Sequence, residues 1–115
     1  MTLILAQQSR GLTRDITIQD ADGDTITPGA NDAVQATIGR VGQTPKLTIN
    51  KTASTNGSVF TKNSPSDGKN RLRIDATDLA AIDPGTYTLD ILYFDNADAA
   101  EWKTVDRQVF VLEDS

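Results

Sequence analysis

The sequence predicts an all-β fold, an antiparallel β-sandwich of about seven or eight short strands with one short helical turn. Three observations predict it. Short runs of alternating apolar and polar residues recur at intervals of about 8–12 residues. Turns rich in Gly, Pro, Asn and Asp separate these runs, and no long window keeps the 3.6-residue period of a helix. The 115 residues fit a single domain, residues 1–115.

The alternation predicts each strand of the first half in order. In the second run, Leu12, Ile16 and Ile18 share one face. The Asp-Gly pair after this run favours a hairpin, and the Pro-Gly pair at 28–29 ends the short strand that follows. The predicted strands are residues 3–7, 12–19, 25–27, 33–40, 46–51 and 58–62.

The second half continues with a loop, a strand and a helical turn. Residues 63–70 contain nearly every turn-forming residue type, which predicts a mobile surface loop. In the strand at 71–75, Leu72 and Ile74 point inward. Thr77 is predicted to cap a helical turn over 78–82, because its hydroxyl can accept from free N–H groups.

Residues 78–93 carry most of the information about the fold. The helical turn leads through the Pro84-Gly85 turn into an alternating strand. We expect Tyr87 on this strand to bury its ring and to bond its hydroxyl to the backbone. This order is typical of an immunoglobulin-like β-sandwich, which is therefore the predicted fold class. The residues predicted to share the inner face are Tyr87, Leu89, Ile91 and Tyr93.

The last predicted strand covers residues 101–112. Its even-numbered positions have aromatic residues near the ends and polar residues between them, whereas its odd-numbered positions include three valines. We therefore place Val105, Val109 and Val111 in the core.

The composition excludes several classes of function. The net charge is −5, without histidine or cysteine. An acidic chain without a basic face is not expected to bind nucleic acid, and the lack of cysteine excludes disulfides and thiolate metal sites. The N-terminus lacks the regions of a signal peptide, and no run approaches the roughly 20 apolar residues of a membrane span. We expect synthesis in the cytoplasm and no membrane partner.

Three ordered pieces of the chain resemble one family of domains. They are residues 16–23, a strand entering an acidic Asp-Gly turn; residues 29–38, a short loop leading into a strand; and the helical turn followed by Asp83-Pro84-Gly85-Thr86-Tyr87. Their order resembles the immunoglobulin-like N-terminal domain of phage baseplate upper proteins, and similar small sandwiches on phage tails and capsids. The likeness spans about three quarters of the chain.

This resemblance implies a non-enzymatic structural component of a phage virion, either a capsid decoration protein or a tail or baseplate accessory. It implies other virion proteins as partners, in a homo-oligomeric or multi-copy assembly, and a location in the virion. Baseplate upper proteins continue into coiled or receptor-binding regions, whereas this sequence stops at Ser115, so we expect a complete, free-standing accessory protein. The alternative is a host-surface recognition module that binds carbohydrate or protein through loops 63–70 and 95–100.

One acidic turn is a candidate metal site. Asp20, Asp22 and Asp24 alternate around Gly23, and calcium prefers such oxygen-rich loops. The spacing departs from the EF-hand pattern, so a solvated hairpin turn is the competing interpretation.

A third hypothesis for the whole chain is a calcium-dependent adhesion domain. Calcium would then raise the melting temperature, and Asp22→Ala would remove the rise. No other cofactor is expected.

The sequence offers little for catalysis. Histidine and cysteine are absent, and no general base can be assigned to the serines. Two carboxylate pairs, Asp75 with Asp78 and Asp95 with Asp98, have spacings that also suit surface turns. We expect that the protein is not an enzyme. The serines considered are Ser54, Ser58, Ser64 and Ser66.

Edge strands and exposed side chains are the candidates for docking. The apolar strand at 3–7 has no capping turn before it, so residues 1–8 are expected to exchange or to pair with a partner strand; residues 46–51 are a second candidate edge. Arg71 and Arg73 face outward, either to meet an acidic neighbour or as a charged, solvated edge. Trp102 lies at the rim or forms an exposed anchor in one patch with Tyr93 and Phe94. The interface candidates are Leu3, Ile4, Leu5, Arg71, Arg73, Tyr93 and Trp102.

Overall fold

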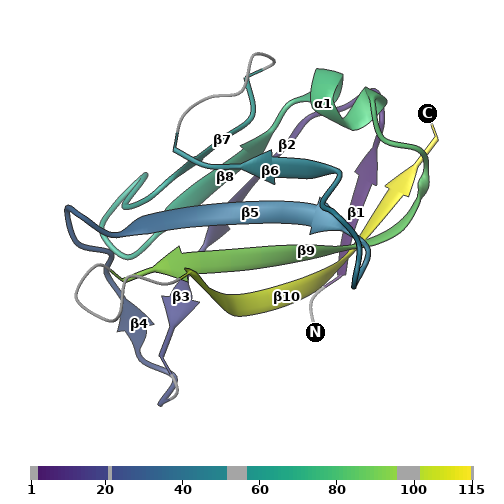
Figure 1. Ribbon diagram of the computed structural model, residues 1–115. Coiled ribbons are helices and arrows are strands. Elements are labelled where there is room, and N and C mark those ends of the chain that lie inside the picture. The colour runs from purple at the N-terminus through teal and green to yellow at the C-terminus, as the bar shows by residue number, and fades with distance from the viewer. Residues whose placement is uncertain (1–2, 21, 52–56, 96–101, 115) are drawn as a thin grey trace.

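A computed structural model provides the structure, which describes all residues except 1–2, 21, 52–56, 96–101 and 115. The described residues form mainly strands and one short helix (Figure 1), so the predicted all-β class is confirmed. The elements are β1 (Leu3–Gln7), β2 (Leu12–Ile16), β3 (Ile18–Gln19), β4 (Thr25–Ile26), β5 (Ala33–Gly39), β6 (Leu47–Ile49), β7 (Val59–Thr61), β8 (Asn70–Ile74), α1 (Ala76–Ala80), β9 (Gly85–Phe94) and β10 (Trp102–Glu113).

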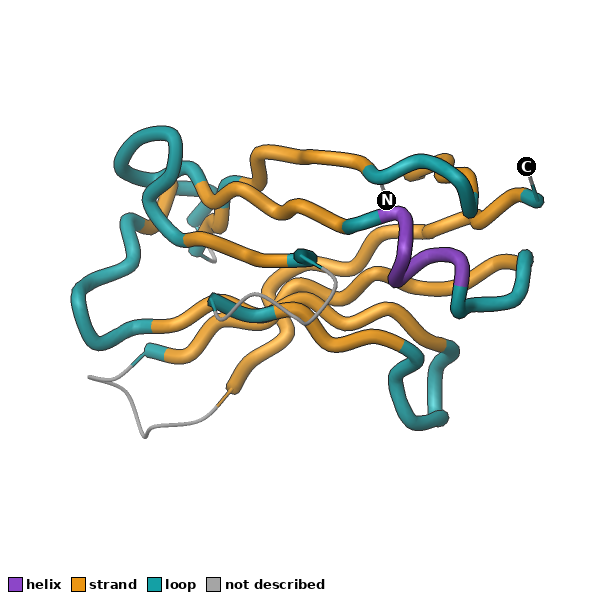
Figure 2. Tube along the Cα trace, turned by 90° about the horizontal axis from the view of Figure 1, so that it is seen from above, coloured by secondary structure: helices purple, strands orange, loops and turns teal. Residues whose placement is uncertain are grey.

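The strands form three sheets. The order in the five-stranded sheet is β1-β10-β9-β5-β6, the order in the three-stranded sheet is β2-β8-β7, and the β3-β4 hairpin is the third sheet. Neighbouring strands are antiparallel except β1 and β10, which run parallel. The two larger sheets lie in two layers (Figure 2), and a hydrophobic core with residues from both fills the space between them.

The inner face of β9 supplies the centre of this core, as its alternation predicts. Its four alternating residues are each at most 7% exposed. The opposing sheet contributes Phe60, Leu72 and Ile74, which are fully buried. Burying one such side chain stabilises the fold by roughly 1.5–3 kcal/mol. The buried residues of β9 are Tyr87, Leu89, Ile91 and Tyr93.

The face of β10 differs from the prediction because the strand contains a β-bulge. The register with β9 shifts between Thr104 and Asp106, which leaves Val105 as the extra residue. Val105 itself packs against the core, but beyond it the alternation changes parity. The predicted core residues Val109 and Val111 therefore lie on the outer face, only partly buried. The buried residues of this half of the strand are Phe110 and Leu112.

The helix also begins earlier than predicted. The N-cap of α1 is Asp75, whose carboxylate accepts from the N–H of Thr77 at 3.0 Å. The prediction of Thr77 as the cap was wrong because Asp75 leaves β8 in an extended conformation, which is the geometry that a capping residue needs. Thr77 lies in the first turn instead.

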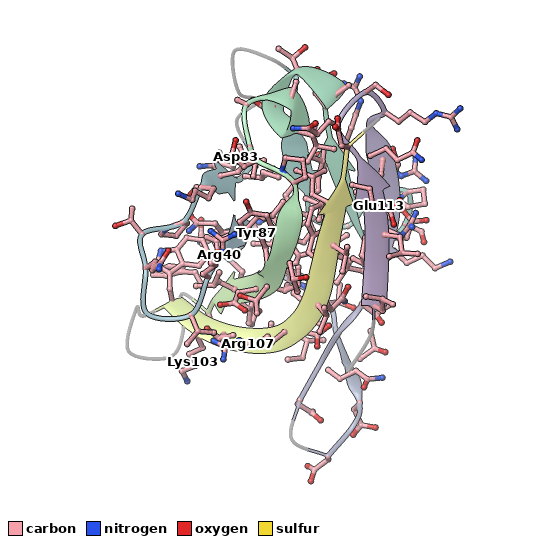
Figure 3. The ribbon with its side chains drawn as sticks, turned by 90° about the vertical axis from the view of Figure 1, so that its right-hand side faces the viewer. Arg40, Asp83, Tyr87, Lys103, Arg107 and Glu113 are labelled. Atoms are coloured by element: carbon pink, nitrogen blue, oxygen red, sulfur yellow. The ribbon has the colours of Figure 1, made fainter. Side chains whose placement is uncertain are left out.

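Tyr87 joins the start of β9 to the chain that precedes it. Its hydroxyl donates to the backbone carbonyl of Asp83 at 2.6 Å, which confirms the predicted backbone bond. The guanidinium of Arg40 lies over the ring, 4.5 Å from its centroid (Figure 3). A cation at this distance adds an electrostatic attraction to the burial of the ring.

We expect Tyr87→Phe to lower the free energy of unfolding by about 1 kcal/mol, because it removes one hydrogen bond without opening a cavity. Urea unfolding followed by circular dichroism measures this change. Arg40→Met is the matched control, since it removes the cation above the ring and leaves the hydroxyl bond in place. Unchanged stability of Tyr87→Phe would show that this bond contributes nothing net.

Candidate docking surface

Strand β1 lies at one edge of the five-stranded sheet, and its residues alternate between core and solvent. Leu3 and Leu5 point outward and are 57% and 59% exposed, whereas Ile4 and Ala6 are buried in the core. Ile4 is therefore not available to a partner, and its prediction as an interface residue was wrong. Sequence reasoning assigned all three apolar residues of this strand to the interface, although successive residues of a strand point to opposite faces of the sheet.

The neighbouring strand extends this apolar surface. In the parallel register Leu3 lies beside Val109, and Leu5 lies beside Val111. Residues paired in this way point to the same face of a sheet, so the four side chains form one group. We call Leu3, Leu5, Val109 and Val111 the β1–β10 patch. Contiguous exposed apolar groups mark interaction sites, whereas singly scattered ones do not.

Charged residues of opposite sign flank the patch along β10 (Figure 3). On one side the Nε of Arg107 donates to Asp90 Oδ1 at 2.8 Å, and an Nη of Arg107 donates to Oδ2 at 3.2 Å. This hydrogen bond raises the pKa of Arg107. On the other side Glu113 is exposed, beside Gln7 of β1. The patch therefore has the Arg107–Asp90 ion pair at one end and the Glu113 carboxylate at the other.

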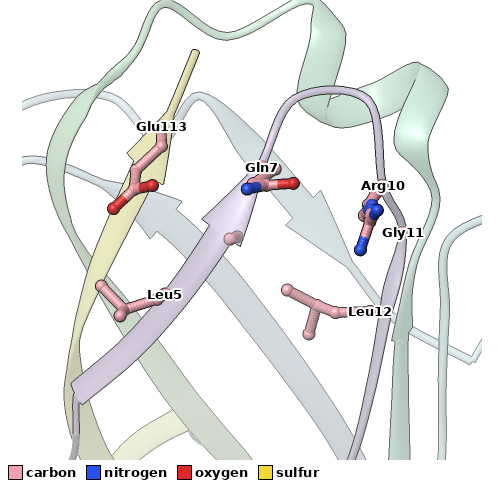
Figure 4. A pocket seen from close by; sticks show the side chains of 7 residues that line it. Leu5, Gln7, Arg10, Gly11, Leu12 and Glu113 are labelled. Carbon is pink, nitrogen blue, oxygen red and sulfur yellow. The ribbon is translucent and has the colours of Figure 1, made fainter. Parts of the chain in front are cut away.

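A shallow pocket of about 340 Å³ lies beside the patch, between β1 and the start of β2. Leu5 and Leu12 line it together with the polar side chains of Gln7, Arg10 and Glu113 (Figure 4). The pocket is open, and its lining mixes apolar and charged groups. It is therefore suited to side chains at the margin of a protein interface rather than to an enclosed small molecule.

The other sheet edges are short or charged, whereas β1 is neither. The segment Leu3–Gln7 contains no charged residue and no proline. By comparison, Arg14 and Asp15 are exposed on edge strand β2, and edge strands β6 and β7 have three residues each. Charges and short length are the usual protection of an edge against pairing. The predicted availability of β1 to a partner strand stays a prediction.

Arg71 and Arg73 face outward as predicted, but β8 is the central strand of its sheet and not an edge. The Nε of Arg71 donates to Asp15 on β2 at 3.0 Å, which holds the pKa of Asp15 below its usual value. Arg73 lies 3.6 Å from Asp75 and donates to the carbonyl of Gly57. Both cations therefore have partners within the chain.

The two aromatic interface candidates have different environments. Tyr93 is buried, and its hydroxyl donates to Asp32 Oδ2 at 2.7 Å. Trp102 is 44% exposed, and its ring centroid lies 5.6 Å from that of Phe94. A small pocket beside Trp102 includes Gln35 in its lining. Most of the predicted recognition loop 95–100 lies outside the described residues.

The acidic turn uses its first carboxylate internally. Asp20 Oδ1 accepts from the N–H groups of Asp22 and Asp24 at 2.9 and 3.0 Å, a pattern that stabilises turns without a metal. Within the described part of the chain, no three metal-binding side chains are grouped. The cation site at Asp20, Asp22 and Asp24 stays a prediction.

Among the catalytic candidates, Ser58, Asp75 and Asp78 contribute to the fold. The hydroxyl of Ser58 is buried, donates to the carboxylate of Asp78 and accepts from the N–H of Asp75. It therefore ties the chain before β7 to α1 and is not exposed to a substrate. Ser64 and Ser66 lie in the loop 63–70, while Ser54 and Asp98 lie outside the described residues.

One cation that sequence reasoning missed binds the loop before β5. The Nζ of Lys62 donates to the carbonyls of Gly29, Ala30 and Asp32 at 2.5, 3.0 and 2.7 Å. A lysine at the end of a short strand gives no signal of this kind in a sequence. The nearby Asn63 donates to the carbonyl of Pro28 and accepts from Gly68. The loop 63–70 is thus held by hydrogen bonds at its base.

A comparison with known protein families and with curated proteins finds no match for this chain. In the described residues, no helix has the length and apolar character needed to cross a membrane. The site is therefore assigned from its own geometry.

The Tyr93 hydroxyl makes stability depend on pH in the alkaline range. Burial and the neighbouring carboxylate of Asp32 raise the pKa of Tyr93 above its ordinary value, which is about 10. The proton is lost first in the unfolded state, so its stabilising contribution is complete below about pH 10 and decreases at higher pH.

We expect the free energy of unfolding to fall above about pH 10 more steeply in the wild type than in Tyr93→Phe. Urea titrations at a series of alkaline pH values measure both slopes. Tyr87→Phe is the control, because it keeps Tyr93 and should retain the steep fall. Parallel slopes for the wild type and Tyr93→Phe would contradict this assignment.

Proposed function

We propose that the chain is an immunoglobulin-like β-sandwich that serves as a non-enzymatic structural component of a phage virion. The order of strands in the two larger sheets supports the immunoglobulin-like assignment, as does the parallel pairing of β1 with β10. The bond from the Tyr87 hydroxyl to the carbonyl four residues upstream also supports it, since a tyrosine corner of this kind recurs in such folds. The virion role rests on the resemblance of the sequence to phage domains.

The β1–β10 patch is the observation that carries the docking role. It places exposed leucines on a sheet edge that lacks charge and proline. The side chains that border it belong to paired strands, so the surface is rigid before any partner binds. A rigid apolar surface with a polar margin is the usual anatomy of a protein interface.

The partners in this proposal are other virion proteins, on the capsid or on the tail and baseplate. Rigid docking of many copies in a symmetric array is the mechanism. No catalytic role is assigned, and the hydroxyl of the candidate Ser58 is buried and bonded to Asp78.

We expect Leu5→Lys to reduce incorporation into particles of the parent phage at least about tenfold, because it places a charge within the apolar docking surface. Quantitative mass spectrometry of purified particles measures the copy number. Val41→Lys is the matched control, since Val41 is an exposed valine in the β5–β6 loop, 70% exposed. Equal incorporation of Leu5→Lys and wild type would exclude this surface.

A point substitution is preferable to deletion of residues 1–8. Ile4 and Ala6 are buried in the core, so the deletion removes core contacts as well as the edge. We therefore expect the truncated chain to lose stability, and its failure to assemble would have two explanations. Leu5→Lys changes a side chain that the core does not contain.

A second candidate function is recognition of a host-surface carbohydrate or protein through the end of the five-stranded sheet where Phe94 and Trp102 lie. The exposed Trp102 beside Phe94 favours it, because exposed aromatic side chains are frequent anchors in recognition. This candidate uses the end of β10 away from the β1–β10 patch, so different substitutions separate the two functions.

If this second function holds, Trp102→Ala should lower binding to host cells or to an immobilised glycan by at least about tenfold. Glycan arrays followed by titration on whole cells measure the effect. Leu5→Lys serves as the control and should bind normally. Absence of binding by the wild-type chain to any glycan or cell surface would remove this candidate.

A further inference from the structure

We propose that the occupant of the β1–β10 patch is the same patch on a second copy of this chain, related to the first by a two-fold axis. This inference rests on the docking role proposed above and names the partner at that surface. The residues that face outward on β10 and β1 are arranged symmetrically about one level of the sheet.

The outward side chains of β10 form a symmetric series with opposite charges at its ends. In order they are Arg107, Val109, Val111 and Glu113, and the centre of the series is Phe110. On β1 the outward leucines Leu3 and Leu5 are centred on Ile4, and Ile4 lies beside Phe110 in the parallel register. Both strands therefore have their centre at the same level of the sheet.

A two-fold axis at this level reverses the direction of β10 in the second copy. When the two outer faces approach, Arg107 lies opposite Glu113 of the second copy, and each contact occurs twice. The valines meet in the same way, Val109 opposite Val111. On the neighbouring strand Leu3 comes opposite Leu5. The apolar residues then form the centre of the contact, and opposite charges form its two margins.

The charges at the margins are available for this pairing. Arg107 uses its Nε and one Nη for Asp90, and a guanidinium has five N–H donors, so donors remain for a second carboxylate. Glu113 makes no ion pair within the described residues. A carboxylate of the second copy can accept from these remaining N–H groups of Arg107.

Charge also favours a second copy locally despite the net charge of −5. The four residues of the patch are uncharged, and Glu113 of one copy meets the Arg107–Asp90 ion pair of the other rather than an isolated like charge. Such local complementarity fixes the register of an interface and suppresses alternatives in which like charges meet.

The first test is the oligomeric state across a concentration series. Sedimentation equilibrium of the wild-type chain should show a monomer–dimer equilibrium, and Leu5→Lys should raise the dissociation constant at least about hundredfold because both copies contribute the buried lysine. Circular dichroism confirms that the variant is folded, and Val41→Lys is the matched control. A wild-type chain that stays monomeric at every concentration, or a dimer that Leu5→Lys leaves unchanged, overturns the proposal.

The second test separates local pairing from net charge. Glu113→Arg makes the chain less acidic, which on net charge alone would tighten association, whereas the proposed contact predicts about tenfold weaker association. Combining it with Arg107→Glu, and with Asp90→Asn to remove the carboxylate that Arg107 neutralises, exchanges the two charges and should restore the wild-type dissociation constant. Asp22→Arg, the same charge change in the β3–β4 turn, is the control and should not weaken association. Tighter association of Glu113→Arg, or no restoration by the exchange, overturns the proposed register.

These results are distinguishable from failure of the virion role. A chain that stays monomeric, together with loss of particle incorporation by Leu5→Lys, would retain the docking surface and refute the second copy as its occupant. A dimer disrupted by Leu5→Lys, together with normal incorporation of that variant, would support the self-association and refute the surface as the site of virion docking.

Discussion

The surface chemistry of this protein depends on one irregularity, the bulge at Val105. An extra residue reverses which side chains of β10 face the core. Phe110 and Leu112 then complete the interior, and the two valines that alternate with them are displaced to the outside. The exposed patch is therefore not a failure of packing. The bulge shifts the register of β10 and turns its two valines outward, and the outward leucines of β1 lie beside those valines.

The end of the sheet that carries Tyr93 and Trp102 depends on a different kind of contact, between backbone groups and the partly buried polar side chains of Lys62 and Asp32. Lys62 follows β7 in one sheet, and the three carbonyls that it binds precede β5 in the other. Asp32 adds bonds to the N–H of Gly29 and to Tyr93. Together they fix the crossing between the layers. The ammonium group of Lys62 thus supplies donors to carbonyls of a segment that belongs to no helix or strand.

Sequence reasoning succeeded where a side chain's role follows from its immediate neighbours. The inner face of β9 and the Tyr87 hydroxyl bond follow from alternation and from the Pro-Gly turn. It failed at Val105 because a bulge depends on the partner strand, and alternation extrapolated through it assigns every later residue to the wrong face. It also missed Lys62, whose partners lie about thirty residues away in the chain and are carbonyls common to all residues. For the candidate site, Leu3 and Leu5 were predictable, but the valines beside them were not.

The parallel pairing of β1 with β10 has a consequence for the order of events during synthesis. Leu3 and Val109 lie side by side, although Leu3 is made long before Val109. Contacts of such large sequence separation form slowly and late, after the loop-closure entropy has been overcome. The β1–β10 patch therefore forms only when β1 pairs with β10. A nascent chain on the ribosome does not display it, and association is delayed until each copy has its finished shape.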